Sequence, residues 1–325
     1  MKQNKYHTYI WACEFNNYSG EGKLSVLYLK YLLENKEIKN YIIESPLNIY
    51  TYADLKNLNK VKKQKSTFYF KYITPFIGLF KILKNHYLYK KKTVYLNYIP
   101  LWNFILFLFL PRKTILGPIT GSEFFNSINI RSIFRNNVIK FLNLISKFII
   151  NVKYSELIFS TNLIKINKKN HKYLFQLQYL LKKKKRKKIK KKIYLIFYYR
   201  KHPNKYSVYE IDYLKKLIKS GKKVKIVGDF HPELKNYCVG HLSQKGLVNL
   251  LDKSKYTISS LENPFSFFVQ DAILSNIKVI FHQQQRKYLS KCYKNYLLLD
   301  FFKRNSLLKD NNFKGTDINK NIKFF

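Results

Sequence analysis

The chain has 325 residues, of which 46% are hydrophobic and 17% aromatic, and its formal net charge is +44 at pH 7. This length allows two domains of ordinary size, and the apolar content excludes a disordered basic chain. Only seven of the 62 basic residues are Arg. Lys runs are usually solvated surfaces. Attraction to an anionic membrane surface is the main alternative, and we do not expect dedicated nucleic-acid binding.

The cysteine pattern and the length of the most apolar segment indicate where in the cell the protein would act. Cys13, Cys238 and Cys292 are too few and too scattered for a disulfide framework or a zinc site, so we expect no metal site. A reducing cytoplasm is the natural compartment for such a chain. The most apolar run, Leu101–Leu110, is shorter than the roughly 20 residues of a spanning helix. We therefore expect a cytoplasmic protein, at most peripheral at the inner face of the cytoplasmic membrane.

The N-terminal half opens with a strand, a loop and a helix. Tyr6–Phe15 is a short β-rich run, and apolar residues recur at helical spacing over Leu24–Leu32. Gly20, Glu21 and Gly22 lie in the loop between them, where glycines would let the backbone approach a ligand or simply form a turn. The sequence has no GxGxxG or GxxxxGK[ST] pattern, so it supports neither a dinucleotide enzyme nor a P-loop NTPase.

Further strands and helices follow along this half. Ile38–Glu44 and Lys92–Ile99 are predicted strands, and Asn126–Ser155 is a predicted basic, aliphatic helix. Two apolar stretches, Tyr69–Leu88 and Leu101–Leu110, suit either core helices or patches that lie on a membrane interface.

A lysine-rich run, Leu181–Lys192, is the sharpest break in composition. Like charges repel one another, so the run predicts a solvated linker near a domain boundary. We therefore expect an N-terminal domain over residues 1–165, a basic linker over 166–192, a C-terminal domain over 193–300 and a tail over 301–325.

Strand and helix patterns alternate regularly in the second half, which predicts a parallel sheet with right-handed crossovers. We predict strands over Ile193–Tyr199, Val224–Val227 and Tyr237–His241, and helices over Tyr206–Ser220 and Ser243–Leu251.

The segment that follows, Ser254–Gln285, organises the rest. It reads as a strand ending at Ser260, an elbow that holds Glu262, a helix over Phe265–Ser275 and a strand over Lys278–His282. We predict Asn263 as the N-cap of the helix, with Pro264 at its first position. Glu262 would then lie where parallel sheets usually bind ligands, although it could be a solvated loop residue.

This segment resembles the signature of retaining, family four-like glycosyltransferases of the GT-B fold. In that family a strand ending in Ser leads to Glu, and a second Glu follows eight residues later. Ser259, Ser260 and Glu262 match, whereas Gln270 replaces the second Glu. The resemblance implies that Glu262 is catalytic, near the donor sugar and diphosphate.

The same resemblance implies further contacts to the donor. Asn263 and Ser266 would lie at the diphosphate, where the helix begins. Gln270, or the neighbouring Asp271, would contact the ribose, and Gln270 is the weaker candidate because an amide has only one acceptor oxygen. Arg200 and Lys205 match an Arg and a Lys, five residues apart, that grip the diphosphate in the family.

In the N-terminal half the resemblance covers two loops. Gly117–Glu123 is similar to the family's Gly-Pro-Ile-Gly-Gly-Gly-Glu loop, so Gly121 and Glu123 would line the interdomain cleft together with Gly20, Glu21 and Gly22. Thr120 and Ser122 replace glycines of that loop. The histidine that often touches the donor sugar has no counterpart in the N-terminal loops.

The resemblance implies two Rossmann-like domains that face a central cleft, and a retaining, metal-independent glycosyltransferase. Its partners would be a nucleotide-sugar donor, as substrate and not cofactor, and a carbohydrate or lipid-linked acceptor in cell-surface polysaccharide biosynthesis. No bound cofactor is expected. Two alternatives stay open: a catalytically silent homologue, and a basic nucleic-acid-binding protein.

Overall fold

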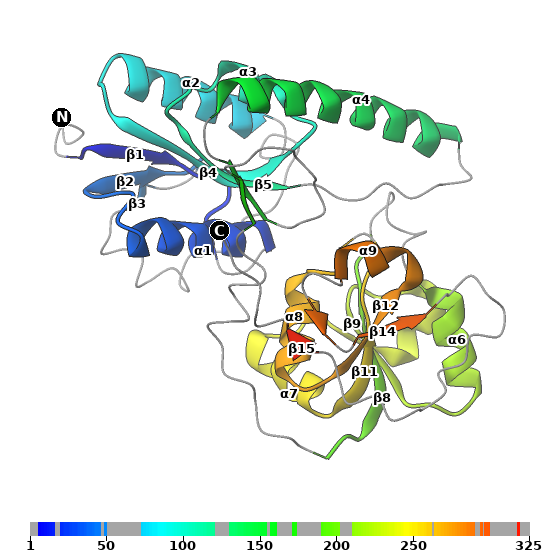
Figure 1. The fold of residues 1–325 in the computed structure, drawn as a ribbon. Helices are drawn as coiled ribbons and strands as arrows, with labels where there is room; N and C mark the ends of the chain where they lie inside the picture. Colours follow the sequence, from blue (N-terminus) through cyan, green and yellow to red (C-terminus); the bar gives the residue numbers. More distant parts are fainter. Residues whose placement is uncertain are drawn as a thin grey trace. The chain divides into compact units, whose positions relative to one another are not determined.

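The structure is a computed structural model. It describes residues 6–16, 20–46, 49–50, 73–120, 130–154, 157–160, 171–173, 190–201, 210–261, 263–289, 293–294, 296–299 and 317–318. The chain divides into two compact units (Figure 1). Unit 1 comprises Met1–Gly121, Phe134–Phe175 and Phe324–Phe325, and unit 2 comprises Ser122–Ile133 and Gln176–Lys323.

Unit 1 is built on a seven-stranded sheet with the order β3-β2-β1-β4-β5-β6-β7. All its neighbouring strands are parallel except β2 and β3, which are antiparallel. The strands are β1 (Thr8–Trp11), β2 (Tyr41–Glu44), β3 (Ile49–Tyr50), β4 (Lys92–Pro100), β5 (Ile115–Thr120), β6 (Leu157–Phe159) and β7 (His171–Tyr173). The helices are α1 (Gly20–Glu34), α2 (Thr74–Tyr87), α3 (Phe104–Phe109) and α4 (Ile130–Lys153), which belongs to unit 1 from Phe134 onward.

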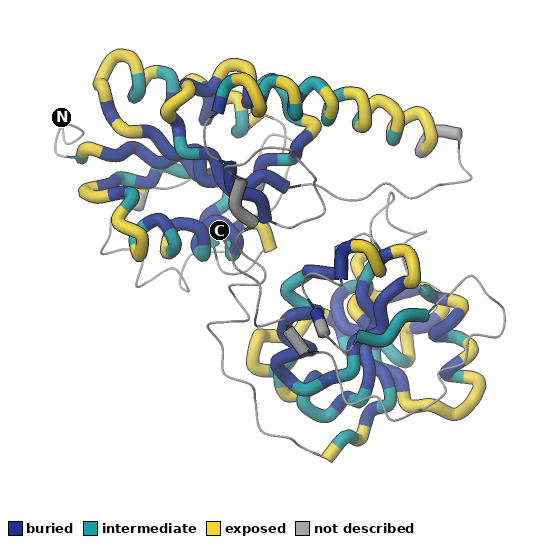
Figure 2. Tube along the Cα trace, viewed as in Figure 1, coloured by how far each residue is buried: buried dark blue, intermediate teal, exposed yellow. Residues whose placement is uncertain are grey.

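The helices of unit 1 form two layers around this sheet (Figure 1). Helices α2, α3 and α4 cover one face, where Leu79, Phe107 and Ile150 join one buried cluster with Trp11 and Tyr95 of the sheet. Helix α1 lies on the opposite face. Figure 2 shows that the sheet is buried between the layers, whereas the outer sides of the helices are exposed.

Of the two loops that the sequence predicts in unit 1, Gly20–Gly22 and the described part of the second, Gly117–Thr120, belong to regular elements. Gly20, Glu21 and Gly22 form the first turn of α1, where the carboxylate of Glu21 complements the helix dipole. Gly117 lies inside strand β5. A glycine is needed there because α1 packs closely on the sheet at this point. A Cβ at Gly117 would lie only 1.9 Å from the ring of Tyr28.

Unit 2 is built on a six-stranded, fully parallel sheet with the order β10-β9-β8-β11-β12-β14. The strands are β8 (Ile193–Tyr199), β9 (Val224–Gly228), β10 (Cys238–Gly240), β11 (Ser254–Ile258), β12 (Lys278–His282) and β14 (Leu297–Leu299). The helices are α6 (Ile211–Lys219), α7 (Gln244–Asp252), α8 (Phe267–Leu274) and α9 (Arg286–Leu289), with 3-10 turns η5 (Pro232–Tyr237) and η6 (Gln283–Gln285).

Counted along unit 2, this sheet has the strand order 3-2-1-4-5-6, which is the order of dinucleotide-binding folds. The expected α/β class with two Rossmann-like, parallel-sheet units is confirmed. Strands β8 and β12 have the predicted bounds, because each is a short apolar run between clear breaks.

The domain limits stay a prediction, and the structure adds three facts near them. Strand β7 extends the sheet of unit 1 to Tyr173, beyond residue 165. Of the run Leu181–Lys192, only the last three residues are described, and Lys191 donates to two main-chain carbonyls of unit 2. In the 301–325 tail, β15 (Asp317–Ile318) pairs with β13 (Tyr293–Lys294).

Candidate functional site at the carboxyl edge of the second sheet

The strand order of unit 2 points to one place for a ligand. In open α/β sheets, ligands bind outside the carboxyl ends of the strands where the strand order reverses. In this sheet the reversal lies between β8 and β11. Arg200 and Lys201 follow β8, and the loop Ser259–Leu261 follows β11. The candidate site therefore joins two segments that are about sixty residues apart in sequence.

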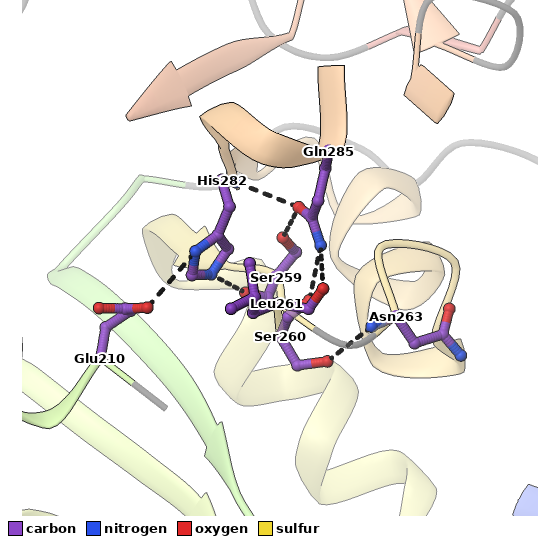
Figure 3. A network of polar contacts seen from close by, with 7 residues as sticks. All are labelled: Glu210, Ser259, Ser260, Leu261, Asn263, His282 and Gln285. Atoms are coloured by element: carbon purple, nitrogen blue, oxygen red, sulfur yellow. Dashed lines mark hydrogen bonds and ion pairs between the residues drawn. The ribbon is translucent and has the colours of Figure 1, made fainter. Parts of the chain in front are cut away.

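A buried glutamine holds the loop after β11 (Figure 3). The side-chain oxygen of Gln285 accepts hydrogen bonds from Ser259 Oγ at 2.9 Å and from the His282 amide at 3.1 Å. Its side-chain nitrogen donates to the carbonyls of Ser260 at 2.8 Å and Leu261 at 3.0 Å. Three of these four bonds fix the chain that leads into Glu262, and the fourth ties it to the end of β12.

A partly buried acid, Glu210, which precedes α6, and a buried histidine, His282, which ends β12, lie beside this loop. The Nε2–H of His282 donates to the Ser259 carbonyl at 3.1 Å, and Nδ1 lies 3.4 Å from Glu210 Oε1. Burial raises the pKa of Glu210 to about 7, helped by Asp212, and burial lowers the pKa of His282 to about 4. A protonated Glu210 beside a neutral His282 is the form that suits this geometry.

The next two strands of the sheet, β9 and β10, are followed by an acid and by a second histidine, His241, respectively. Asp229 follows β9, and its carboxylate accepts from the Lys201 amide at 2.7 Å and lies 2.7 Å from His241 Nε2. Burial would raise the pKa of Asp229, but these hydrogen bonds and the charges of His241 and Arg200 lower it below its usual value. Asp229 is therefore an anion, and it fixes the chain on both sides of Arg200: its carboxylate accepts from the Lys201 amide, and its own amide donates to the Tyr199 carbonyl at 2.9 Å.

The helix after the loop begins later than the sequence predicts. Ser266 is the N-cap of α8, and its Oγ accepts from the Val269 amide at 3.3 Å. The prediction of Asn263 as the cap is wrong, because the Asn263 side chain accepts from the Phe265 amide at 2.9 Å and so forms a local turn. Ser266 thus lies at the helix N-terminus, as expected for a residue beside a phosphate.

The two residues expected at the ribose lie in the interior. Gln270 is fully buried and donates from Nε2 to the Phe265 carbonyl at 2.8 Å. Asp271 is also buried, and its Oδ2 accepts from Gln244 of α7 at 3.1 Å. The first bond fixes the residue before the N-cap of α8, and the second holds α8 against α7. A ribose contact at either residue stays a prediction.

Other expected site residues are placed as follows. Arg200 is exposed at the end of β8, at the reversal of the strand order. Glu262, Lys205, Gly121 and Glu123 lie outside the described residues. Gly20, Glu21 and Gly22 belong to unit 1, so the structure does not test whether they share a site with Arg200.

Sequence reasoning missed five residues of this edge: Glu210, Asp229, His241, His282 and Gln285. Each follows a strand or precedes a helix in the parallel pattern, so a listing of all polar residues at strand ends would have found them. Their pairing is a property of the fold, since His282 and Glu210 are far apart in sequence.

Comparisons with known proteins identify similar structures but no family. No family model matches the chain, and no curated protein matches it. Anabaena HepE, in complex with UDP and glucose, is 11% identical with a TM-score of 0.46, over 91% of this chain and 86% of that one. UGT2 of Phytolacca americana, complexed with UDP-2-fluoro-glucose and pterostilbene, is 10% identical with a TM-score of 0.48, over 95% and 88%.

A third similar structure is a DNA-modifying β-glucosyltransferase solved with and without its substrate uridine diphosphoglucose. It is 14% identical with a TM-score of 0.39, over 85% of this chain and 79% of that one. With TM-scores below 0.5, these likenesses assign no function to the chain.

Proposed function

We propose that the chain is a GT-B glycosyltransferase that moves a sugar from a nucleotide-sugar donor to a carbohydrate or lipid-linked acceptor. The observation that carries the proposal is the position of Arg200. It lies at the reversal of strand order in unit 2, and across that reversal lies the loop into Glu262, the residue that carries the sequence resemblance. A guanidinium there can bind two phosphate oxygens at once.

In this proposal the chain stabilises the departing nucleoside diphosphate. Arg200 and the N-terminus of α8, capped by Ser266, supply positive charge where negative charge develops. Asp229 fixes the main chain beside Arg200 through the Lys201 amide. Gln285 and His282 hold the loop from which Glu262 would reach the sugar. Lys205 would add a second cation to the diphosphate.

The finer features also belong to the proposal. Transfer would retain the anomeric configuration without a metal or bound cofactor, in the assembly of cell-surface polysaccharide. The protein would act in the cytoplasm, at the inner face of the cytoplasmic membrane. The sequence resemblance over residues 193–290 supports the retaining mechanism, and the net charge supports the membrane location.

The first test is a thermal-shift screen of the full chain against UDP, GDP, ADP and CDP. A ligand that binds only the folded state raises its apparent stability, so one of the four should raise the melting temperature. If none does, the proposal fails. A nucleotide that binds without any transfer from its sugar conjugates would instead identify a silent homologue, which the buried Gln270 makes the second candidate.

The second test uses neighbouring residues. Arg200→Ala should weaken binding of the nucleoside diphosphate about tenfold to hundredfold, since a charged hydrogen bond contributes roughly 1.5–3 kcal/mol. Binding of the free nucleoside should hardly change. Lys201→Ala is the control, because it removes the same charge one residue away while the main-chain bond to Asp229 stays. Equal losses in both variants would indicate general charge attraction and contradict a phosphate contact at Arg200.

A further inference from the structure

Helix α4 presents large apolar side chains on the side that faces away from the sheet of unit 1. The exposed fractions of Phe134, Phe141, Leu144, Phe148 and Val152 are 72%, 62%, 65%, 71% and 63%. Spacings of three, four and seven residues place these side chains along one side of a helix. On the other side, Ile150 is fully buried in the core. The helix is therefore amphipathic, with its second apolar side exposed.

The exposed apolar surface continues onto α3. The end of α3 is tied to the end of α4, because Lys153 donates to the carbonyls of Phe107 and Leu108, and Arg112 donates to the carbonyl of Val152. Leu108 and Phe109 are themselves 47% and 56% exposed. We call Phe134, Val138, Phe141, Leu144, Phe148 and Val152 of α4, with Leu108 and Phe109 of α3, the α3–α4 surface.

The charged residues of the helices on this side of unit 1 have a single sign. The sequences of α2 and α4 contain Lys or Arg but no Asp or Glu, and α3 has no charged residue. Arg135 and Lys140 of α4 are exposed, and Lys147 is half-buried. Within these three helices the apolar strip is therefore accompanied only by cations, which is the composition of helices that lie in the interface of an anionic membrane.

We propose that unit 1 docks on an anionic phospholipid bilayer through the α3–α4 surface, with α4 lying in the plane of the interface. Among the described residues, no helix is long and apolar enough to cross a membrane. Phe134, Val138, Phe141, Phe148 and Val152 also follow coiled-coil spacing, so a second copy is the competing occupant. Two copies would bring like charges together, whereas anionic lipid complements both the apolar strip and its cations.

The proposal does not depend on glycosyl transfer, and its test is a binding measurement. The full chain is sedimented with vesicles made of equal parts phosphatidylcholine and phosphatidylglycerol, and with phosphatidylcholine vesicles. Phe141→Ser/Phe148→Ser should reduce partition into the anionic vesicles by at least about tenfold, because two exposed aromatic rings no longer enter the interface. Phe230→Ser/Leu242→Ser removes two exposed apolar side chains of unit 2 and should have little effect.

Two charge-matched double variants distinguish docking through α4 from general electrostatic attraction of the basic chain to anionic lipid. Lys140→Gln/Lys147→Gln and Lys219→Gln/Lys235→Gln remove the same charge, from α4 and from unit 2 respectively. Docking through α4 predicts a clearly larger loss for the first pair. Equal losses from both pairs, or equal losses from both apolar pairs, would overturn the proposal.

A fluorescence measurement locates the helix directly. In Phe148→Trp, brominated acyl chains should quench the new indole in anionic vesicles, whereas the indole of Phe230→Trp should not be quenched. If neither is quenched, α4 does not lie in the bilayer. Sedimentation velocity tests the competing occupant, since a dimer that Phe141→Ser/Phe148→Ser dissociates would assign this surface to a second copy and overturn membrane docking.

Discussion

Replacing Gln285 by Leu tests whether one buried amide holds the candidate site. The change keeps a similar volume but removes four hydrogen bonds: those from Ser259 Oγ and the His282 amide, and those to the Ser260 and Leu261 carbonyls. A hydrogen bond contributes roughly 1 kcal/mol and a buried polar group left unsatisfied costs roughly 1–3 kcal/mol, so the loss of this network should lower the free energy of unfolding by about 3 kcal/mol or more. That is a large fraction of the roughly 5–15 kcal/mol of an ordinary domain.

The assay can be specific to unit 2. Both tryptophans, Trp11 and Trp102, lie in unit 1, so tryptophan fluorescence reports on that unit and circular dichroism on both. In urea, Gln285→Leu should lower the midpoint of the transition seen only by circular dichroism. Gln284→Leu is the matched control, because Gln284 is exposed in the same 3-10 turn. If the two variants unfold at the same urea concentration, the network does not stabilise the unit.

Two further predictions concern the same edge. Between about pH 4.5 and 6.5 the pair Glu210–His282 should add no pH dependence to the free energy of unfolding, because the pair binds one proton in both states. That proton is on His282 in the unfolded chain and on Glu210 in the folded chain. The stability from Glu210 is present below its unfolded pKa and is lost as pH rises through about 7, whereas that from His282 is lost as pH falls through about 4. Glu210→Gln should therefore make the free energy of unfolding rise by up to about 1.4 kcal/mol per pH unit over this range, and a flat profile in denaturant titrations would contradict the assignment. Gly228→Ala should be destabilising by more than about 1 kcal/mol, because φ is +103° and a Cβ would lie 2.2 Å from the Tyr199 carbonyl. Thermal unfolding measures the change. Gly20→Ala, in open space at the start of α1, is the control and should be neutral or stabilising in the same measurement.

The strands were the most predictable part of the molecule, and the reason is local. Ile193–Tyr199 and Lys278–His282 are apolar runs buried in a parallel sheet, and such runs are recognised from sequence alone. The start of α8 was not predictable in this way, because Asn263 and Ser266 are both good caps. Their roles depend on which amide each side chain reaches in the folded loop.

Long-range contacts explain the other differences. Gly117 looks like part of a ligand loop, but its lack of a side chain makes room for Tyr28, which comes from another element. Gln285 is unremarkable in sequence, between two other glutamines and an arginine, and acquires its role only when β11 and β12 lie side by side. The position of Arg200 at the end of β8 could be predicted because the apolar strand before it is recognisable in the sequence, whereas its binding role stays a prediction.

Three cations of this chain bind main-chain carbonyls instead of carboxylates, which has a consequence for acid conditions. Lys153 donates to carbonyls at the end of α3, Arg112 to carbonyls at the end of α4, and Lys191 to the carbonyls of Asp252 and Ser275, where α7 and α8 end. Helix C-termini carry partial negative charge that no proton can remove. These cations therefore keep their partners at a pH where carboxylates would be neutral, and the ends of the helices act as permanent counterions in a protein with few acidic residues.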